Sequence, residues 1–433
     1  MKVVAFVPAK GNSERIQNKN LKILDGKPLF LRQIERLLKM DCIDEVYLDT
    51  DSDEFIEIAS HTGCKILKRD SSLASNATDG NVLFYNEVCQ VEADVYIQSL
   101  CTSPFISEET YSNGIEILKR NEDYDSVVLI RNQKQYTWNF ESKRPDYNLD
   151  KIPNSKDLPD TIVETMGMYM VRADSVFKTK RRIGQNPFLL EAKAIEAIDV
   201  NYPDDFELAN YIAAGIRESE RKVFQNLGHI LSSAILSDIF DDIGIKNQII
   251  SGLILNIAGK KMLGRAKTLK IKKRENSDTT SIYDALLSYD TIVPNDIIVV
   301  ENECPSFAYF GELNANLAIR AGSIGAIIGG KTRDSSAVRN LDFPVFSAGF
   351  GCQDVKHQGT LESMNKPVNI HGVVVNVNDL IFADNEGLVV IPQGIENKVL
   401  SLAKDVLKKE NHIVNEVAEG IDVNELRRRH GDF

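Results

Sequence analysis

The chain is most constrained by a regular alternation of buried strands and amphipathic helices through its first half. The run Val3–Val7 contains no polar residue, which is typical of a strand buried on both faces. Apolar residues at helical spacing follow over 29–40. Strand-like and helix-like stretches then alternate at 44–51, 53–60, 64–68, 82–91, 95–100, 108–118 and 126–130. This order predicts an α/β fold with a mostly parallel sheet and helices on both faces.

Length and charge set the broad class of the protein. A chain of 433 residues exceeds one ordinary core, so we expect two domains, 1–222 and 223–433, divided at the charged run that ends in Lys222. A net charge of −12 argues against nucleic acid or anionic membranes as partners, so any basic site must be local. The widely spaced cysteines indicate reduced thiols, and the chain begins as a strand without a secretory pattern. We therefore expect a cytoplasmic protein.

The loop after the first strand concentrates positive charge. It places Lys10, Arg15 and Lys19 around Gly11 and Ser13, at the carboxyl end of the strand, where open α/β sheets bind ligands. Small residues allow close approach of the backbone, and three cations suit a triphosphate. The alternative is a solvated basic loop. The spacing is neither a Walker loop nor G-x-G-x-x-G, so the common phosphate motifs do not account for it.

This loop resembles the signature of the cytidylyltransferases that make CMP-sialic acid and CMP-Kdo. Lys10 stands at the first Arg of that signature, Arg15, Lys19, Asn20 and Leu21 match, and Gln17 replaces the usual Pro. The resemblance implies a Rossmann-like nucleotidyltransferase in which Arg15 and Lys19 are catalytic. It also implies that CTP contacts the residues Pro8, Ala9, Lys10, Gly11, Asn12, Ser13, Arg15, Lys19 and Asn20.

Three further stretches resemble the same family. They are Asp49-Thr50-Asp51, the segment 101–105 and the segment 197–206. The resemblance makes Asp199 a ligand of Mg²⁺, with Asn201 where relatives often have a second Asp. A helix N-cap is the alternative role for Asp199.

The residues that would contact the sugar acid also follow from the resemblance: Arg69, Thr102 and Ser103. A bidentate Arg suits a substrate carboxylate. For Arg69, a solvated loop position is the alternative. The polar segment 132–164, with the only tryptophan, resembles the arm through which relatives dimerise.

The implied reaction explains the residue types. A sugar hydroxyl attacks the α-phosphate of CTP and pyrophosphate leaves, so catalysis depends mainly on positioning and on neutralising charge. Lysine and arginine side chains hold the phosphates, and a carboxylate holds magnesium through oxygen.

The second half has its own pattern. We expect a helix over 230–243 and strands over 252–258, 267–271 and 296–300. A helix beginning at Glu312 leads to a strand over 326–328, after which Arg333 and Asp334 follow.

This half, over about 227–420, resembles the family that joins the regulator of ribonuclease activity A (RraA) to 4-hydroxy-4-methyl-2-oxoglutarate aldolases. Its aldolase members share an acidic residue, twenty intervening residues and Arg-Asp, which Glu312 and Arg333-Asp334 meet. The segments 343–346 and 379–392 also match, whereas His371 and Val377-Asn378 depart from the family pattern. The resemblance implies an RraA-like α/β/α domain.

The family roles suit a metal-dependent pyruvate aldolase. Asp334 would hold Mg²⁺ or Mn²⁺, which stabilises the enolate formed on C–C cleavage. Arg333 would bind the pyruvate carboxylate, and Glu312 would orient or deprotonate a water. Main-chain N–H groups near Leu313, Asn314 and Ala315 would form an oxyanion site. The alternative is that Arg333 and Asp334 only pair on a loop.

Together, the two halves predict a bifunctional enzyme. Its substrates would be CTP, a 2-oxo sugar acid and pyruvate, because pyruvate aldolases make or break the acids that the first family activates. Two other hypotheses remain: the first half activates a non-sugar acceptor such as a phosphonate, or the second half is a non-catalytic RraA-like binding or oligomerisation module. We expect a homo-oligomer, with dimers through the first domain and trimers or hexamers through the second.

Overall fold

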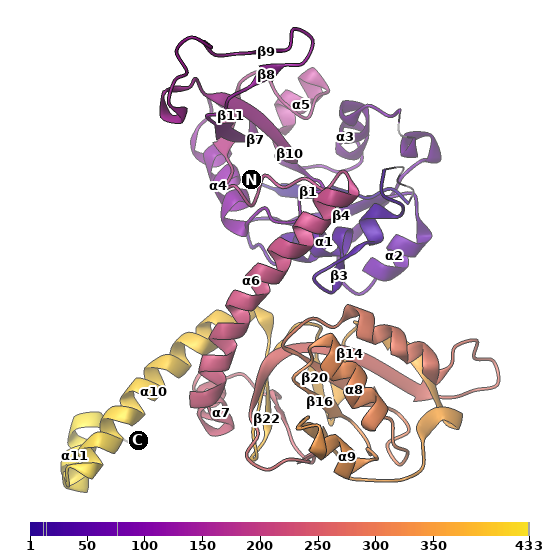
Figure 1. Cartoon of the computed structure of the whole chain (residues 1–433), viewed down its shortest axis with the longest axis vertical. Helices are drawn as coiled ribbons and strands as arrows, with labels where there is room; N and C mark the ends of the chain where they lie inside the picture. Colours follow the sequence, from indigo (N-terminus) through magenta and orange to yellow (C-terminus); the bar gives the residue numbers. More distant parts are fainter. Residues whose placement is uncertain (12, 14, 76, 432–433) are drawn as a thin grey trace. The chain divides into compact units, whose positions relative to one another are not determined.

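The computed structural model describes residues 1–11, 13, 15–75 and 77–431. The chain divides into two compact units, Met1–Ala214 and Gly215–Phe433 (Figure 1). Both units are α/β, as predicted. The division falls inside helix α6 (Pro203–Ile230), and the boundary predicted after residue 222 lies within the same helix.

The first unit is built on a seven-stranded sheet in the order β11-β7-β10-β6-β1-β4-β5. The strand β1 pairs in parallel with β4 and β6, while β10 runs antiparallel between β6 and β7. The sheet is therefore mostly parallel, as predicted. Its strands are β1 (Val3–Pro8), β4 (Glu45–Thr50), β5 (Lys65–Lys68), β6 (Val95–Ser99), β7 (Ser126–Gln133), β10 (Thr161–Arg172) and β11 (Pro187–Glu191).

Both faces of this sheet are covered. Alternate side chains of β1 enter different apolar clusters, with Val3, Ala5 and Val7 in one and Val4 and Phe6 in the other. The first cluster includes side chains of α1, α2 and α4, and the second includes side chains of α3 and α5. These helices are α1 (Leu29–Leu38), α2 (Asp53–Ala59), α3 (Gly80–Val88), α4 (Glu108–Arg120) and α5 (Ala173–Thr179).

An arm projects between β7 and β10 (Figure 1). It contains the short strands β8 (Trp138–Asn139) and β9 (Arg144–Pro145), which pair antiparallel. The arm exposes apolar side chains, including Trp138 and Phe140. A second small hairpin, β2 (Ile23–Leu24) and β3 (Lys27–Pro28), follows the basic loop.

The second unit contains a nine-stranded mixed sheet. Strands β14 to β17 are parallel neighbours. At one side β13 pairs antiparallel with β17, and at the other side β18 and β21 pair antiparallel with β14. Strand β22 then pairs antiparallel with β21. The strands are β12 (Ile249–Ile250), β13 (Ile254–Leu255), β14 (Met262–Lys273), β15 (Asp296–Asn302), β16 (Gly325–Ile328), β17 (Val345–Ser347), β18 (Gly359–Met364), β21 (Leu380–Ala383) and β22 (Leu388–Ile391). A separate hairpin joins β19 (Val368–Ile370) and β20 (Val373–Val375).

Helices cover this sheet too. Side chains of α8 (Glu312–Ala321) and α9 (Ser335–Asn340) enter one apolar cluster, and side chains of α7 (Ser233–Asp242) and α10 (Glu396–Ala418) enter another. The last helix of the described residues is α11 (Val423–His430). Within the described residues, none of the helices combines the length and the apolar character that crossing a membrane requires.

The helix expected over 230–243 is confirmed for most of its length by α7 (Ser233–Asp242), which begins where the Ser232 side chain accepts a hydrogen bond from the Ile235 N–H (3.2 Å). One local prediction differs from the structure. The strand expected over 252–258 is reduced to the two residues of β13. A left-handed Gly252 (φ 81°) precedes this short strand.

Candidate functional site

The predicted phosphate loop brings its cations close to Asp199. The Lys19 Nζ donates to the Val200 carbonyl oxygen (3.0 Å), next to Asp199 in the chain. Burial lowers the pKa of Lys19, the negative charge of Asp199 opposes this effect, and the positive charges of Arg15 and Lys10 add to it. Three cations of one loop and a carboxylate distant in sequence therefore act on one another at one end of the sheet.

Backbone contacts fix the shape of this loop. The Gly11 N–H donates to Asp51 Oδ1 (2.9 Å), and the Asn20 amide donates to the Lys10 carbonyl (3.2 Å). A Cβ at Gly11 would lie 3.1 Å from the Ser52 Cβ, so the absence of a side chain allows this close approach. The predicted contact Asn12 lies outside the described residues.

The remaining loop residues differ in exposure. Arg15 is exposed, with its guanidinium 5.3 Å from the ring centre of Tyr202. Ser13 is half-buried, and Ala9 is buried with its N–H bonded to the Asp49 carbonyl (2.9 Å). The Pro8 carbonyl accepts a weak contact from the Cys101 thiol (3.7 Å).

Asp199 has a carboxylate oxygen available for a cation. Its Oδ2 accepts a hydrogen bond from the Asn201 amide, while its Oδ1 is buried and has no hydrogen-bond partner among the described residues. The N–H groups just before α6 are bonded instead to Asp205 in its first turn, whose Oδ2 accepts from Asn201 (2.9 Å) and Tyr202 (2.7 Å). The alternative of a helix N-cap at Asp199 is therefore wrong, and a buried, unpaired carboxylate oxygen fits a hard ion such as Mg²⁺.

Arg69 is buried and paired with Asp49. Its Nε lies 3.0 Å from Asp49 Oδ1, its Nη2 lies 2.7 Å from Asp49 Oδ2, and the two side chains are 3% and 2% exposed. The alternative of a solvated loop position is wrong. The predicted contact of Arg69 with a sugar acid stays a prediction, with its Nε and Nη2 engaged by Asp49.

The Arg69–Asp49 pair adjoins a second buried carboxyl group. Burial, with the negative charge of Asp49, raises the pKa of Glu87 well above its usual value. A protonated Glu87 can donate a hydrogen bond to Asp49. Its Oε2 accepts from the Gln98 amide (2.8 Å), so this network reaches β6.

Of the other predicted sugar-acid contacts, Thr102 is half-buried and accepts the Val200 N–H at its carbonyl (2.8 Å). Ser103 is fully buried, and its hydroxyl has no partner among the described side chains. A Cβ at Gly167 would lie 2.5 Å from this hydroxyl, so Ser103 lies tightly against the backbone of β10.

The motifs did not predict Tyr169 and Arg182. The Arg182 guanidinium lies 4.0 Å from the ring centre of Tyr169. Burial and a hydrogen bond to Glu164 raise the pKa of Tyr169, and the charge of Asp199 contributes to the shift. The only sequence signal for this cation was the basic pair Arg181-Arg182, which by itself resembles any solvated loop.

In the second unit, the Arg-Asp pair lies beside the start of α8. Asp334 Oδ2 lies 3.5 Å from the Arg333 Nε and accepts the Glu312 N–H (3.3 Å). The Arg333 Nη1 makes a shorter ion pair with Asp354 (2.7 Å), which the sequence did not indicate. Arg333 and Asp334 therefore do pair, but within a cluster that also includes the helix start.

Room for this cluster depends on Gly311. A Cβ at Gly311 would lie 2.5 Å from Asp334 Oδ2 and 3.1 Å from the Arg333 Cγ. Asp334 adopts a left-handed backbone conformation (φ 52°) and precedes α9. Its carboxylate is partly exposed, which leaves it accessible to a divalent cation.

Arg333 also lines a shallow pocket with a cavity volume of about 10 Å³, which is room for about one water molecule. The pocket is lined by Asn256, Phe310, Thr332, Arg333, Ser335, Val338, Val345 and Phe350. A cation among mostly apolar and small polar groups is suited to a small carboxylic acid.

The predicted oxyanion donors differ from one another. The Ala315 N–H is bonded to the Gly311 carbonyl (3.0 Å) and its side chain is fully buried. Leu313 is 74% exposed, and the Asn314 amide lies 3.5 Å from the Tyr309 carbonyl. Glu312 is exposed at the helix start, so the surface of this turn is formed by residues 312–314.

The two departures from the family pattern have local explanations. Asn378 takes the left-handed conformation (φ 65°) at a position where relatives have glycine, which Asn tolerates better than most residues. His371 (φ 50°) similarly replaces glycine, and its Nδ1 lies 2.8 Å from the Ser251 carbonyl.

The two halves of the chain match different protein families. Residues 4–195 match the cytidylyltransferase family model, and residues 233–390 match the Aldolase/RraA family model. The chain is 28% identical over 223 residues to CMP-N,N'-diacetyllegionaminic acid synthase of Legionella pneumophila, covering 48% of this chain and 94% of that protein.

Two further relatives are covered less completely. Protein DlpA of Legionella pneumophila is 28% identical over 200 residues, which is 45% of this chain and 32% of DlpA. A putative 4-hydroxy-4-methyl-2-oxoglutarate aldolase of Halalkalibacterium halodurans is 31% identical over 146 residues, which is 33% of this chain and 65% of that protein. The chain thus spans about a third of DlpA and somewhat under two thirds of the aldolase.

Proposed function

Because the chain joins a cytidylyltransferase domain to an RraA-like domain, we propose a bifunctional enzyme of sugar-acid activation. The first domain transfers CMP from CTP to a 3-deoxy-2-ulosonic acid of the sialic acid or Kdo type and releases pyrophosphate. The second is a metal-dependent lyase for a related 2-oxo acid. The observation that supports the first activity best is the group of Lys10, Arg15 and Lys19 beside the unpaired Asp199 oxygen.

The residues of the first domain have distinct roles in this proposal. Lys10, Arg15 and Lys19 neutralise the triphosphate, and Lys19 stabilises the charge that develops on the leaving pyrophosphate. Asp199 holds Mg²⁺ through its free oxygen, and that ion supplies further charge neutralisation. Arg182, beside Tyr169, is a second cation for the sugar carboxylate besides the predicted Arg69.

A pyrophosphate-release screen tests the first activity. The full chain is incubated with CTP, Mg²⁺ and separate acceptors: N-acetylneuraminate, a legionaminic acid, Kdo and simple phosphonates. We expect release only with a sugar acid and only with CTP among the nucleotides. Release with a phosphonate but no sugar acid would replace the proposal with the alternative acceptor class, and no release with any acceptor would contradict it.

The second domain uses Arg333 to bind the carboxylate of a 2-oxo acid and Asp334 to hold Mg²⁺ or Mn²⁺. The bound metal supplies an electron sink for C–C cleavage or formation. Glu312 lies at the adjoining helix start and orients a water. The pocket at Arg333 supports the position of this site, because its lining combines the guanidinium with apolar and small polar groups.

Coupling of the two activities has a direct test. The full chain is incubated with pyruvate, an aldose panel, CTP and Mg²⁺, and CMP-sugar is measured. We expect CMP-sugar from pyruvate plus aldose, because pyrophosphate release pulls the condensation forward. Formation of CMP-sugar from preformed acid alone would end the coupling hypothesis while leaving the first activity intact.

Replacing Asp334 with Asn should lower pyruvate release from 2-oxo acid substrates by at least about 100-fold, since the amide is a weak ligand for a hard cation. The rate is measured by a coupled pyruvate assay. Asp342→Asn is the matched control, because that exposed carboxylate pairs only with Lys260 at the surface in this structure. Equal rates in D334N and wild type would favour the other hypothesis, in which the second half is a non-catalytic RraA-like binding or oligomerisation module.

Replacing Gly311 with Ala should cost about 100-fold in the same assay, because the new Cβ displaces the Asp334 carboxylate by about an ångström. Gly394→Ala is the control, since its Cβ would have no neighbour within 4 Å. An unchanged rate in G311A would show that the position of Asp334 is not critical.

The oligomer is also a proposal. The arm exposes Trp138 and Phe140, which suit a dimer contact through the first domain, and the second domain assembles as trimers or hexamers. Light scattering of the full chain, compared with a Phe140→Ser variant, measures both contributions.

A further inference from the structure

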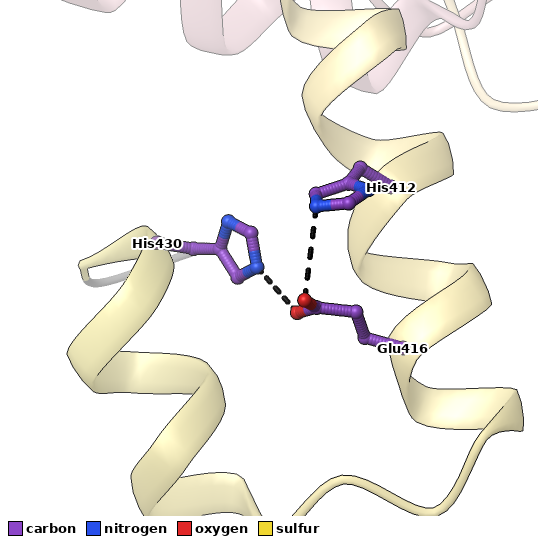
Figure 2. A group of neighbouring side chains, drawn as sticks. All are labelled: His412, Glu416 and His430. Carbon is purple, nitrogen blue, oxygen red and sulfur yellow. Dashed lines mark hydrogen bonds and ion pairs between the residues drawn. The ribbon is translucent and has the colours of Figure 1, made fainter.

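The two C-terminal helices bring two histidines and a glutamate together (Figure 2). His412 and Glu416 lie one turn apart on α10, and His430 reaches the same carboxylate from α11. The His430 Nε2 lies 2.5 Å from Glu416 Oε2, and the His412 Nε2 lies 3.7 Å from Glu416 Oε1. One ligand atom from each residue lies within 4.8 Å of the others, and the described residues contain no second group of this kind.

We propose that His412, Glu416 and His430 form a binding site for a divalent transition metal, with Zn²⁺ as the best match. Two imidazole nitrogens and one carboxylate oxygen are a donor set that Zn²⁺ favours, and three protein ligands leave a fourth position for water. This site is separate from the proposed Mg²⁺ ligands, which offer only oxygen. It also lies beyond the part of the chain that matches the Aldolase/RraA family model.

Metal binding would require the ligand atoms, which lie within 4.8 Å of one another, to draw together. Metal–ligand bonds of about 2.0–2.1 Å at tetrahedral angles place ligand atoms about 3.3 Å apart. In the structure, the His430 Nε2 and Glu416 Oε2 are closer than this, while the His412 Nε2 and Glu416 Oε1 are slightly farther apart. The His412 side chain is 65% exposed, so it can rotate toward the metal without disturbing the core.

The charges around the site also need to be compatible with a cation. The nearest positive group is Arg429, whose Nη1 lies 2.9 Å from Glu416 Oε1. Arg429 already has a second partner, because its Nε lies 2.7 Å from Glu425 Oε1. A metal on Glu416 would therefore leave Arg429 paired with Glu425.

Glu416 is buried at the contact between the two helices, and its two carboxylate oxygens face His412 and His430. His430 is the ligand supplied by α11. Binding of the metal would therefore fasten α11 to α10.

Metal titration of the full chain tests the proposal. Millimolar Mg²⁺ is present throughout to fill oxygen-only sites, and Zn²⁺ binding is followed by calorimetry and Co²⁺ binding by visible absorbance. We expect one Zn²⁺ per chain and a tetrahedral Co²⁺ spectrum. His412→Ala and His430→Gln should each weaken binding by more than about 100-fold, beyond the loss expected for a merely supporting residue.

Two controls keep the outcome decisive. His357→Gln removes an exposed histidine elsewhere and should leave binding unchanged. Circular dichroism checks that each variant is folded, and Glu416→Gln provides a third variant if one histidine variant is not. Equal binding in wild type, H412A and H430Q would overturn the proposal, as would a Co²⁺ spectrum with thiolate bands, which would place the metal on cysteines such as Cys89 or Cys352.

Discussion

Replacing Lys19 with Met is expected to reduce kcat for cytidylyl transfer by about 100- to 1,000-fold, the cost of removing one donor that faces developing charge. Lys19 donates to the Val200 carbonyl oxygen, next to Asp199 in the chain, and interacts electrostatically with Asp199, Arg15 and Lys10. Pyrophosphate release under saturating CTP and sugar acid measures the effect. A change in KM for CTP alone would assign Lys19 to binding and not to the chemical step.

The pH dependence of cytidylyl transfer tests whether catalysis needs the positive charge of Lys19 or only the shape of its side chain. Since burial lowers the pKa of Lys19 from 10.5, the cation is lost at a lower pH than for an ordinary lysine, and activity should fall as pH rises through that lowered pKa. Arginine stays charged throughout, so Lys19→Arg should retain activity and lose the alkaline fall. The same alkaline fall in both proteins would mean that another group controls it.

Replacing Arg69 with Met should destabilise the first unit by about 3–5 kcal/mol, because it leaves the Asp49 carboxylate buried without its partner. The expected loss of stability is large because Asp49 is buried and a second buried carboxyl group, Glu87, lies beside it. For a unit of this size the melting temperature should fall by about 10 °C, measured by calorimetry.

The double variant Asp49→Asn/Arg69→Met is the matched control for this prediction. It removes the uncompensated charge, so its stability should recover most of the loss. If the double variant were as unstable as Arg69→Met, lost packing rather than unpaired charge would be the cause. A stable single variant would contradict the importance of the pair.

The sequence predicted the fold well where one local signal was sufficient. The apolar run Val3–Val7 is a central strand with both faces covered, as its pattern indicated. The alternation that followed it identified a mostly parallel sheet, but not that β10 enters antiparallel, because strand direction depends on connections and not on residue pattern.

The candidate sites were less predictable, since long-range partners decide them. The sequence named Arg69 but not its pairing with Asp49, which lies on a neighbouring strand. It named Arg333 and Asp334 but not Asp354, which comes from a loop beyond β17. Such ion pairs depend on the exact approach of separate segments, which no local motif encodes.

The position of the only tryptophan gives the protein an intrinsic optical probe. Trp138 lies on the projecting arm and is 58% exposed, so the indole emission of the whole chain arises from that one segment. A blue shift or reduced quenching on concentration would report burial of the arm, with no label attached and no contribution from either core.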